Sequence, residues 1–375
     1  MNLYEYQGKE IFRNAGIPVP EGRLIRTPDE LEEAGKTLAL PVIAKAQVLA
    51  GKRGKAGLIK LADSWDQVED CLDQWIGKKF NGEVIESVLL EKALNIDREL
   101  YLSVTIDPAA GSPIVIGCGE GGMDIEEISR EKPEAVVRRH INIFRGVQPF
   151  QVRDVVSDIR LDGPAAKSFG KILFALYEVF RSYDAELAEI NPLVVDKAGN
   201  LWAVDSKIRM DDSALPRHKG FSKSENDFGD ALEYEAYENG LSYVRLNGNI
   251  GVICTGAGLT MATLDLVKLN GGHPANFLDF GGANYRNAAN ALRTVLKNPS
   301  VKVLLLVTFG LFARADTIAE GIVHAIKELR PKTPIVMAVR GTGEKRAREL
   351  IKEVGIETVN DTEEAVRRAV SIAEA

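Results

Sequence analysis

The sequence predicts an α/β protein of two domains, a mixed α+β domain over residues 1–235 and a doubly wound parallel sheet over residues 245–375. A chain of 375 residues is longer than one typical hydrophobic core requires. Before residue 210, several short strands follow one another closely, which favours antiparallel pairing. After residue 249, an apolar strand followed by a turn and a helix recurs five times, which indicates a parallel sheet.

Apolar spacing and end signals place the elements of the first domain. Apolar residues recur at helical spacing from Leu3 to Ala15, and Gly16 ends this helix. Thr27 before Pro28 is an N-cap with proline at the first helical position. Further runs predict helices over 28–38, 64–77 and 165–183, strands over 40–44, 58–62, 84–91, 98–106 and 113–118, and a hairpin of 185–195 with 201–204. A charged helix-loop region is expected over 122–152, and a polar connection over 211–240.

The second domain has a simpler pattern. Its predicted strands cover residues 250–254, 275–279, 301–307, 334–339 and 357–359, and each precedes a helix. In such a sheet, ligands bind at the edge formed by the carboxyl ends of the strands.

Composition and charge limit the classes of function. The formal net charge of -7 argues against nucleic acid as the main partner. No apolar run approaches the ~20 residues that span a bilayer, and residues 1–7 do not resemble a signal peptide. Cys71, Cys118 and Cys254 are far apart, which suits a reducing cytoplasm, and the four histidines show no metal-ligand spacing. We therefore expect a cytoplasmic protein with neither a membrane nor a nucleic acid partner.

A basic, glycine-rich loop follows the strand that ends near Lys45. Gly51, Gly54 and Gly57 alternate with Lys52, Arg53 and Lys55. Glycine allows close approach of a ligand, backbone N–H groups can cradle phosphate oxygens, and lysine and arginine add charge. The loop therefore predicts a phosphate site, with a solvated basic hairpin as the alternative.

Two carboxylates, Glu91 and Glu99, flank a short loop between two predicted strands. A carboxylate in such a place can accept hydrogen bonds from an adenine amino group or from ribose hydroxyls. A solvated turn is the alternative, and it is favoured when this stretch is taken by itself.

Three oxygen-bearing side chains lie on the predicted hairpin 185–204 and directly after it. Glu189 and Asn191 are two residues apart and share one face of a strand, and Asp205 is expected opposite them. Their neighbours are apolar, and charges on an otherwise buried strand need a cation. Oxygen donors of this kind predict a Mg²⁺ site beside nucleotide phosphates.

A turn with the sequence Thr255-Gly256-Ala257-Gly258 opens the first helix of the second domain. Free N–H groups and the helix dipole make such a turn a potential anion site. A simple strand-to-helix turn is the alternative.

Five stretches in order resemble one family over nearly the whole chain: MNLYEYQGKEIF, AKAQVLAGKRGKAG, AEINPLVV, LNGNIGVICTGAGLTMATLD and NFLDFGG. They are similar to the β subunit of succinyl-CoA synthetase, which has an ATP-grasp domain followed by a flavodoxin-like domain. The resemblance implies the reaction of an acid, CoA and ATP to acyl-CoA, ADP and phosphate. It also implies an α subunit that carries a phosphohistidine and most of the CoA site, in a heterodimer or heterotetramer.

The resemblance assigns roles to individual residues. It implies that Glu189 lies where the phosphoryl group is passed on and that Asn191 and Asp205 hold Mg²⁺. It implies that Thr255 with Gly256 and Gly258, and Leu311 with Phe312 and Ala313, meet the acid and phosphate. The residues that it places on ATP are Lys45, Lys52, Arg53, Gly54, Glu91, Leu94 and Glu99.

The chain departs from the family at the acid site. The family has Asn where this chain has Thr255, and Gly-Ile-Val where this chain has residues 311–313. We therefore expect an acid other than succinate, such as malate, citrate or another carboxylate. A non-catalytic nucleotide-binding homologue is the alternative from another class. A carboxylate–amine ligase is disfavoured by the glycine pattern of the second domain.

Overall fold

The computed structural model describes residues 1–51, 53–280, 287–311 and 314–375, without the side chain of Pro28. The chain forms two compact units, Met1–Asp227 and Phe228–Ala375. This division precedes the expected boundary near 235–245 because Ala236, Leu241 and Tyr243 belong to the core of the second unit. Within the described residues, no helix is long and apolar enough to cross a membrane.

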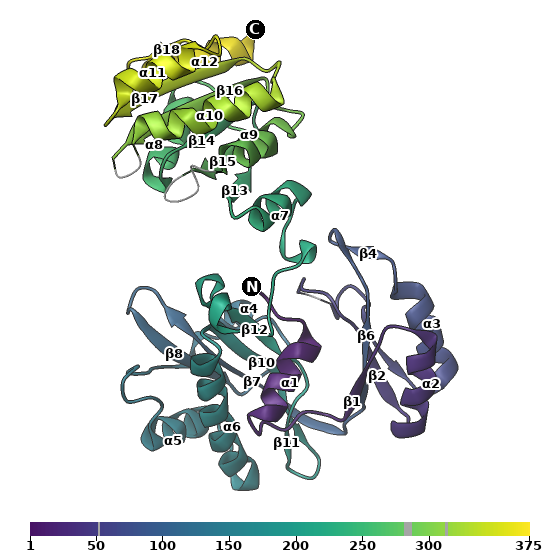
Figure 1. Ribbon diagram of the computed structural model, residues 1–375. Helices are drawn as coiled ribbons and strands as arrows, with labels where there is room; N and C mark the ends of the chain where they lie inside the picture. Colours follow the sequence, from purple (N-terminus) through teal and green to yellow (C-terminus); the bar gives the residue numbers. More distant parts are fainter. Residues whose placement is uncertain (52, 281–286, 312–313) are drawn as a thin grey trace. The chain divides into compact units, whose positions relative to one another are not determined.

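The smaller sheet of the first unit is antiparallel, with the order β1-β6-β2-β3. Its core side chains come from the strands and from the two helices that cover the sheet, α2 and α3 (Figure 1). Both helices begin at the predicted caps, because Thr27 and Ser64 accept hydrogen bonds from the backbone N–H of Glu30 and Gln67. The elements are β1 (Gly22–Ile25), α2 (Pro28–Thr37), β2 (Val42–Ala46), β3 (Ile59–Ala62), α3 (Trp65–Trp75) and β6 (Val88–Lys92), with a small hairpin of β4 (Lys79–Phe80) and β5 (Glu83–Val84).

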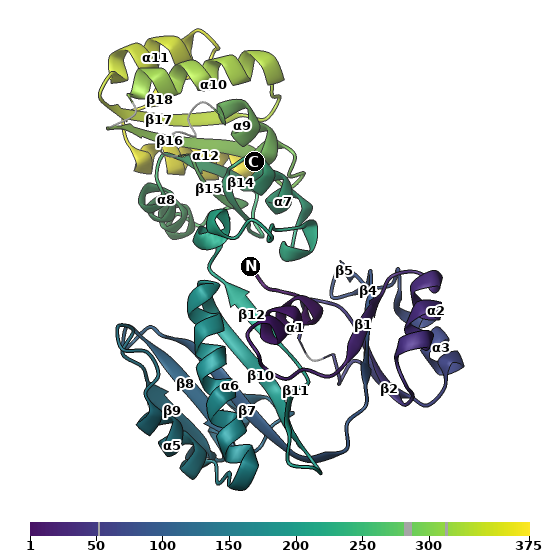
Figure 2. The same ribbon diagram turned by 60° about the horizontal axis from the view of Figure 1, so that its bottom comes forward.

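The larger sheet of the first unit has the order β11-β10-β7-β8-β9, with β12 also paired to β10. The helices α5 and α6 lie on one face of this sheet and complete the largest core of the unit (Figure 2). The strands are β7 (Ile96–Asp107), β8 (Ser112–Cys118), β9 (Val136–His140), β10 (Ala185–Asp196), β11 (Leu201–Ala203) and β12 (Lys207–Met210). The helices are α4 (Ile125–Glu131), α5 (Pro149–Asp158) and α6 (Gly163–Ser182). The expected helix-loop region therefore contains a strand, β9, which pairs with β8.

The helix α1 (Glu5–Asn14) joins the two sheets of the first unit, and it lies between them in both views (Figures 1 and 2). Its apolar residues Ile11 and Phe12 belong to the core of the larger sheet. Its buried polar residues Glu5 and Lys9 instead contact charged side chains of the smaller sheet. One short amphipathic helix thus fixes one sheet to the other.

The second unit is a doubly wound sheet, as the sequence predicts. Its order is β13-β15-β14-β16-β17-β18, and all neighbours except β13 and β15 are parallel. One face carries α9, α10 and α11, and the other carries α8 and α12. The strands are β13 (Ser242–Arg245), β14 (Ile250–Cys254), β15 (Asn276–Asp279), β16 (Val303–Gly310), β17 (Ile335–Gly341) and β18 (Thr358–Val359). The helices are α7 (Ala231–Glu238), α8 (Ala257–Leu269), α9 (Ala288–Leu296), α10 (Ala315–Leu329), α11 (Glu344–Lys352) and α12 (Thr362–Glu374).

The parallel strands follow the flavodoxin-like order, in which the second strand lies outside the first and the others follow on the opposite side. The antiparallel edge strand β13 was not predicted. Only Tyr243 of its four residues is buried, and Val244 is exposed, so it lacks the continuous apolar run of the central strands.

Candidate functional site

A cluster of charged side chains, all buried except Asp205, lies where the smaller sheet meets the larger one in the first unit. The two predicted ATP ligands Lys45 and Glu91 are neighbours in it. Burial of charges is unfavourable unless they are paired, and each member of the cluster has an ionic partner. The cluster consists of Glu5 and Lys9 of α1, Lys45 of β2, Arg53, Glu91 of β6, and Asp205.

The ammonium of Lys45 is held by three acceptors. Its Nζ lies 2.9 Å from Glu5 Oε1 and 2.7 Å from Glu91 Oε2, and it also donates a hydrogen bond to the carbonyl oxygen of Val204. A lysine ammonium has three N–H donors, so all three are engaged. A phosphate oxygen that contacts Lys45 must therefore replace one of these acceptors or share a donor with it.

Arg53 connects the glycine-rich loop to both sheets. Its Nη1 lies 2.6 Å from Glu5 Oε2, and its Nη2 lies 2.9 Å from Asp205 Oδ1. Only 9% of its surface is exposed, whereas the adjacent Gly54 is exposed. The guanidinium is thus placed beside the predicted metal ligand Asp205, and the rest of the loop stays open to solvent.

The cluster shifts the pKa of several of its members. Burial by itself raises the pKa of Glu5, but Lys45, Lys9 and Arg53 outweigh it and hold this pKa well below 4.5. Burial lowers the pKa of Lys45, but Glu5, Glu91 and Asp205 raise it further, so the net change is upward. Burial and the nearby Glu5 raise the pKa of Asp205, despite the opposing cations. Glu5 and Lys45 are therefore both charged at neutral pH.

The predicted oxygen donors lie at a break in the larger sheet. The pairs Leu193 with Ala203 and Glu189 with Lys207 lie on either side of this break. Counting residues from these pairs sets Asn191 opposite Asp205, but no ladder pair joins them, and β10 shifts its register against β7 between Ile190 and Leu193. Asp205 lies between β11 and β12 rather than within a strand. The shared face of these side chains therefore stays a prediction.

Glu189 is held by a tyrosine from the neighbouring strand. Its Oε2 accepts a hydrogen bond of 2.8 Å from the hydroxyl of Tyr101. Burial raises the pKa of Glu189, and Asp205 and Asp124 add to this, whereas Tyr101 and Lys207 oppose it. The carboxyl group thus holds a proton more readily than an exposed glutamate does.

A glycine turn after β8 contacts Asn191. The Oδ1 atom of Asn191 accepts a hydrogen bond of 2.8 Å from the N–H of Gly122, and its Nδ2 donates one of 2.9 Å to the carbonyl of Met123. Gly122 has a φ of 71°, and a Cβ there would lie 2.2 Å from Glu99 Oε2. The turn therefore requires glycine, and it brings Glu99 and Asn191 to one place.

The residues fit a magnesium site of the kind that nucleotide phosphates complete. Among the described residues, no three His, Cys, Asp or Glu side chains form a group that could hold a metal ion. Asp205 and Asn191 nevertheless provide a carboxylate and an amide oxygen at the break in the larger sheet. Mg²⁺ in phosphate sites is usually held by one or two carboxylates, with the substrate and water as the other ligands.

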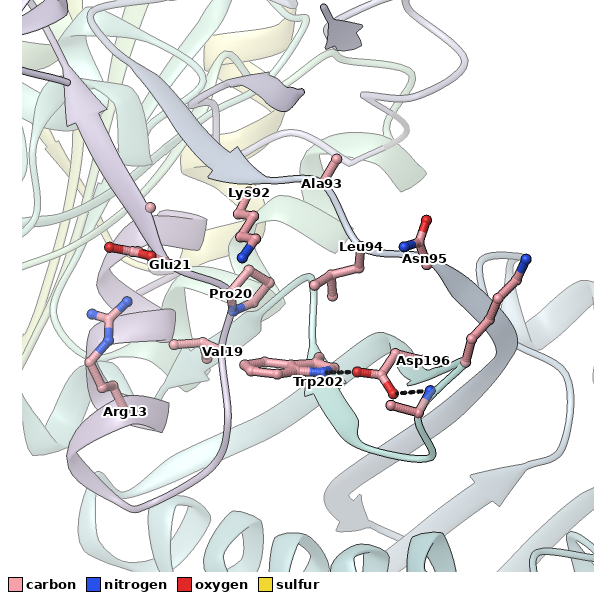
Figure 3. A pocket seen from close by; sticks show the side chains of 13 residues that line it. Arg13, Val19, Pro20, Glu21, Lys92, Ala93, Leu94, Asn95, Asp196 and Trp202 are labelled. Carbon is pink, nitrogen blue, oxygen red and sulfur yellow. Dashed lines mark hydrogen bonds between the residues drawn. The ribbon is translucent and has the colours of Figure 1, made fainter. Parts of the chain in front are cut away.

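Leu94 is one of the residues that line a cavity of about 730 Å³ (Figure 3). Trp202 lies along it, and the indole Nε1 donates a hydrogen bond of 2.9 Å to Asp196 Oδ2. The apolar parts of the wall come from Val19, Pro20, Ala93, Leu94, Ala198 and Trp202. A flat cavity wall of this kind suits an aromatic base.

The predicted anion turn of the second unit is an ordered strand-to-helix connection. Gly256 has a φ of 96°, and its N–H donates a hydrogen bond of 2.8 Å to Asp279 Oδ1. The hydroxyl of Thr255 accepts one of 2.8 Å from the N–H of Phe309. Gly258 is exposed in the first turn of α8, and Leu311 is 75% exposed after β16. This edge thus carries exposed backbone N–H groups at a helix start.

Comparisons with known proteins agree with both halves of this arrangement. Residues 2–195 match the ATP-grasp domain family, and residues 253–372 match the CoA-ligase family. The chain is 42% identical over 373 residues to the ADP-forming sulfoacetate-CoA ligase subunit SauC of Bilophila wadsworthia, covering 100% of this chain and 99% of that protein. It is 43% identical over 376 residues to the ADP-forming succinate–CoA ligase subunit beta of Ignicoccus hospitalis, covering 100% of both.

The chain belongs to the β-subunit family of ADP-forming acid–CoA ligases. Its fold is also that of the ATP citrate lyase of Methanothrix soehngenii, with a TM-score of 0.77 and 18% identity over 99% of each chain. The ATP-grasp and flavodoxin-like assignments made from the sequence are confirmed. A ligase of this family uses ATP or ADP as a substrate.

The structure brings together some of the predicted ligase residues and leaves others apart. Lys45, Arg53 and Glu91 belong to the charged cluster together with Asp205. Leu94 lines the cavity, and Glu99 adjoins the glycine turn at Asn191. The predicted residues Lys52, Phe312 and Ala313 lie outside the described residues.

Three features of the ligase site escaped the sequence reasoning. Glu5 and Lys9 are spaced four apart on a helix, which is the pattern of an ordinary surface ion pair. The turn Gly121-Gly122 was seen only as the end of a strand, although paired glycines before Asp124 were a usable signal. Trp202 gave no signal, because one aromatic residue on a strand is common in a core.

Proposed function

We propose that this chain binds Mg·ATP through its ATP-grasp domain and acts with an α subunit to convert an acid, CoA and ATP into acyl-CoA, ADP and phosphate. The observation that carries the proposal is the cluster of Lys45 and Arg53 beside Asp205. Two cations for phosphates and a carboxylate for a metal occur together in a family that uses ATP. The non-catalytic alternative shares this nucleotide site, so turnover of the reconstituted enzyme distinguishes the two.

Each group has a role in this proposal. The cavity at Leu94 receives the base, with Trp202 along its face. Lys45 and Arg53 bind the phosphates, while Asn191 and Asp205 hold Mg²⁺, which would neutralise phosphate charge when bound. Glu189, held by the hydroxyl of Tyr101, is assigned by the family resemblance to the place from which the phosphoryl group leaves.

The acceptor of the phosphoryl group is proposed to be a histidine of the α subunit. Its approach to the second unit is supported by the exposed start of α8, whose N–H groups and dipole attract a phosphate. His273 and His324 of this unit are exposed, and neither lies in the turn between β14 and α8. We therefore expect no ligase turnover and no phosphohistidine when the chain is assayed alone.

The acid is proposed to be a short dianion other than succinate, with sulfoacetate as the first candidate. Identities of 42% and 43% do not separate the two relatives, and sulfoacetate is put first because it is the acid in the name of one of them. Thr255 Oγ1 accepts from the N–H of Phe309, which leaves its O–H to donate to an anion. This donor suits the acceptor oxygens of a sulfonate and of a carboxylate alike, so the support for an acid other than succinate is the departure at Thr255 from the asparagine of the resembled family.

The deciding experiment is reconstitution with the α subunit from the same organism. ADP release is followed with CoA, Mg·ATP and, in turn, sulfoacetate, succinate, malate and citrate. The expected result is turnover that requires the α subunit and has its highest specificity constant for an acid other than succinate. Absence of turnover with every acid, together with intact ADP binding, would favour the non-catalytic homologue.

A further inference from the structure

The helix α1 carries two buried charged residues that the proposed function does not use. Glu5 and Lys9 are 3% and 2% exposed, whereas Glu10 and Arg13 on the same helix are exposed. A buried carboxylate and a buried ammonium are uncommon unless they are paired. Their partners therefore indicate what the pair does.

Glu5 contacts three cations. One carboxylate oxygen, Oε1, lies 2.8 Å from Lys9 Nζ and 2.9 Å from Lys45 Nζ. The other oxygen, Oε2, lies 2.6 Å from Arg53 Nη1. A single carboxylate from α1 thus holds both cations to which the proposed function gives the nucleotide phosphates.

Lys9 holds the second anion that faces Lys45. Its Nζ donates a hydrogen bond of 2.6 Å to Glu91 Oε1, while Glu91 Oε2 lies 2.7 Å from Lys45. Lys9 also donates a hydrogen bond of 2.8 Å to the carbonyl of Val204, which accepts from Lys45 as well. Lys9 and Lys45 therefore share all three of their acceptors, Glu5, Glu91 and Val204.

The backbone connects the same two elements. The N–H of Tyr6 donates a hydrogen bond of 3.1 Å to Gln47 Oε1, and Gln47 Nε2 donates one of 3.1 Å to the carbonyl of Lys45. The start of α1 is thus tied to the end of β2 by both side-chain charge and main-chain contacts. These contacts restrict where the Lys45 ammonium can lie.

We propose that Glu5 and Lys9 are positioning residues that set the Lys45 and Arg53 cations for the phosphates of the nucleotide. The inference rests on the proposed function of those two cations. The six members of the cluster carry three positive and three negative charges, so their formal sum is zero. Phosphate affinity then depends on where the cations are held and not on an excess of positive charge.

Whether Glu5→Gln strengthens or weakens ADP binding distinguishes a positioning role of Glu5 from a purely electrostatic one. Glu5→Gln makes the cluster more positive, so charge alone predicts tighter ADP binding. Positioning predicts weaker ADP binding, by roughly tenfold, because Lys45 and Arg53 lose their common anchor. Glu5→Asp keeps the charge and moves the carboxylate back by one methylene, and positioning predicts a smaller weakening for it.

The experiment measures ADP and adenosine binding to the full chain without Mg²⁺, by calorimetry and ligand-observed NMR. Glu10→Gln on the exposed side of α1 is the matched control, and it is expected to bind ADP like the wild type. In Glu5→Gln and Glu5→Asp, ADP affinity is expected to fall while adenosine affinity stays unchanged. Equal losses for both ligands, or tighter ADP binding, would overturn the proposal and leave Glu5 as a structural residue.

A double-mutant cycle tests whether Glu5 acts through Lys45. The double variant Glu5→Gln with Lys45→Ala is expected to lose ADP affinity by a smaller factor than the product of the factors for the two single variants. A factor equal to that product would contradict positioning. If Glu5→Gln does not fold, Lys9→Met replaces it in the cycle with the same expectation. If Lys45→Ala itself binds ADP like the wild type, the proposed function fails and not only this inference.

Discussion

The ammonium of Lys45 lies 2.9 Å from a carboxylate oxygen of Glu5, 40 residues earlier in the chain. Lys45 is on a strand of the smaller sheet, and Glu5 is on the helix whose apolar side packs with the larger sheet. Because both groups are nearly inaccessible to solvent, this contact is screened far less than a surface ion pair. The geometry of the proposed nucleotide site is thereby coupled to the packing of α1.

Lys45→Ala is expected to weaken ADP binding by about ten- to a hundredfold, since a charge-assisted contact contributes roughly 1.5–3 kcal/mol. The variant also leaves buried Glu5 and Glu91 with fewer cations, so the melting temperature should fall as well.

Calorimetry with ADP and a thermal melt check these two effects separately. Lys60→Ala is the matched control, because Lys60 is an exposed lysine directly opposite Ala44 on the neighbouring strand. An unchanged dissociation constant in Lys45→Ala, with wild-type behaviour of the control, would remove Lys45 from the nucleotide site.

Asp205→Asn and Asn191→Ala are expected to reduce the gain in ADP affinity that Mg²⁺ provides. Both residues lie in the break between the β10–β11 and β10–β12 pairs, and Asp205 contacts Arg53, one of the two cations proposed to bind phosphate. Titration of ADP with Mg²⁺ and with chelator gives this gain for each variant. Asp66→Asn, an exposed carboxylate on α3, serves as the control. Wild-type gains in both variants would mean that the metal is bound elsewhere.

Trp202 is expected to report occupancy of the cavity at Leu94. Stacking of a base on an indole contributes about 1–3 kcal/mol and alters the emission of the indole. ADP should therefore change the intrinsic fluorescence of the wild type, and this change should disappear in Trp202→Phe. Trp65→Phe, on α3 and outside the cavity, should keep the response. A response retained in Trp202→Phe would place the base in another part of the unit.

Stability should depend on pH through Glu5. The pKa of the Glu5 carboxyl lies well below the ordinary 4.5 in the folded chain, so at pH values between the folded pKa and 4.5 the unfolded chain binds more protons than the folded chain. The contribution of Glu5 to the free energy of unfolding is therefore fully present above pH 4.5 and is lost as the pH falls through the folded pKa. In Glu5→Gln the slope of unfolding free energy against pH should be smaller by up to about 1.4 kcal/mol per unit.

Urea unfolding between about pH 3 and pH 6 measures these slopes. Glu10→Gln should keep the wild-type slope, because Glu10 is exposed. Equal slopes in the wild type and Glu5→Gln would show that Glu5 does not carry this dependence.

The fold was largely predictable because its strongest elements have periodic apolar patterns. The strand at 303–310 and the helix at 163–182 have continuous buried faces, and both were expected. In contrast, β9 ends in Arg138, Arg139 and His140, so its apolar content is only two residues. Pairing with β8 stabilises it, and a local pattern contains no information on such a partner.

The site was predictable only where the ligand chemistry was local. Lys45, Asn191 and Asp205 stood out because charged or polar residues interrupted apolar runs. Glu5 and Lys9 did not, since a helix residue reveals its burial only through contacts 40 and 82 residues away. Long-range pairing of charges therefore had to be read from the structure.

In the proposed function, the choice of acid depends on the turn at Thr255 in the second unit. Thr255 replaces the asparagine of the resembled family, and its hydroxyl is fixed by the N–H of Phe309. Asparagine offers both an amide donor and a carbonyl acceptor, whereas this hydroxyl offers one remaining donor. Loss of one well-placed polar contact costs roughly 1–3 kcal/mol, or about five- to a hundredfold in affinity.

Thr255→Asn is therefore expected to shift the reconstituted ligase towards succinate. The ratio of the specificity constants for succinate and sulfoacetate should rise by about fivefold or more, because the amide restores the N–H donors that the resembled family has at this position. Thr333→Asn, in the connection before β17 and so at the opposite, amino edge of the sheet, is the control and should leave the ratio unchanged. The measurement is steady-state ADP release with each acid at fixed CoA and Mg·ATP. If wild type already has its highest specificity constant for succinate, and Thr255→Asn does not change the ratio, then Thr255 is neutral. The chain would then be the β subunit of a succinate–CoA ligase, with its selectivity set by the α subunit.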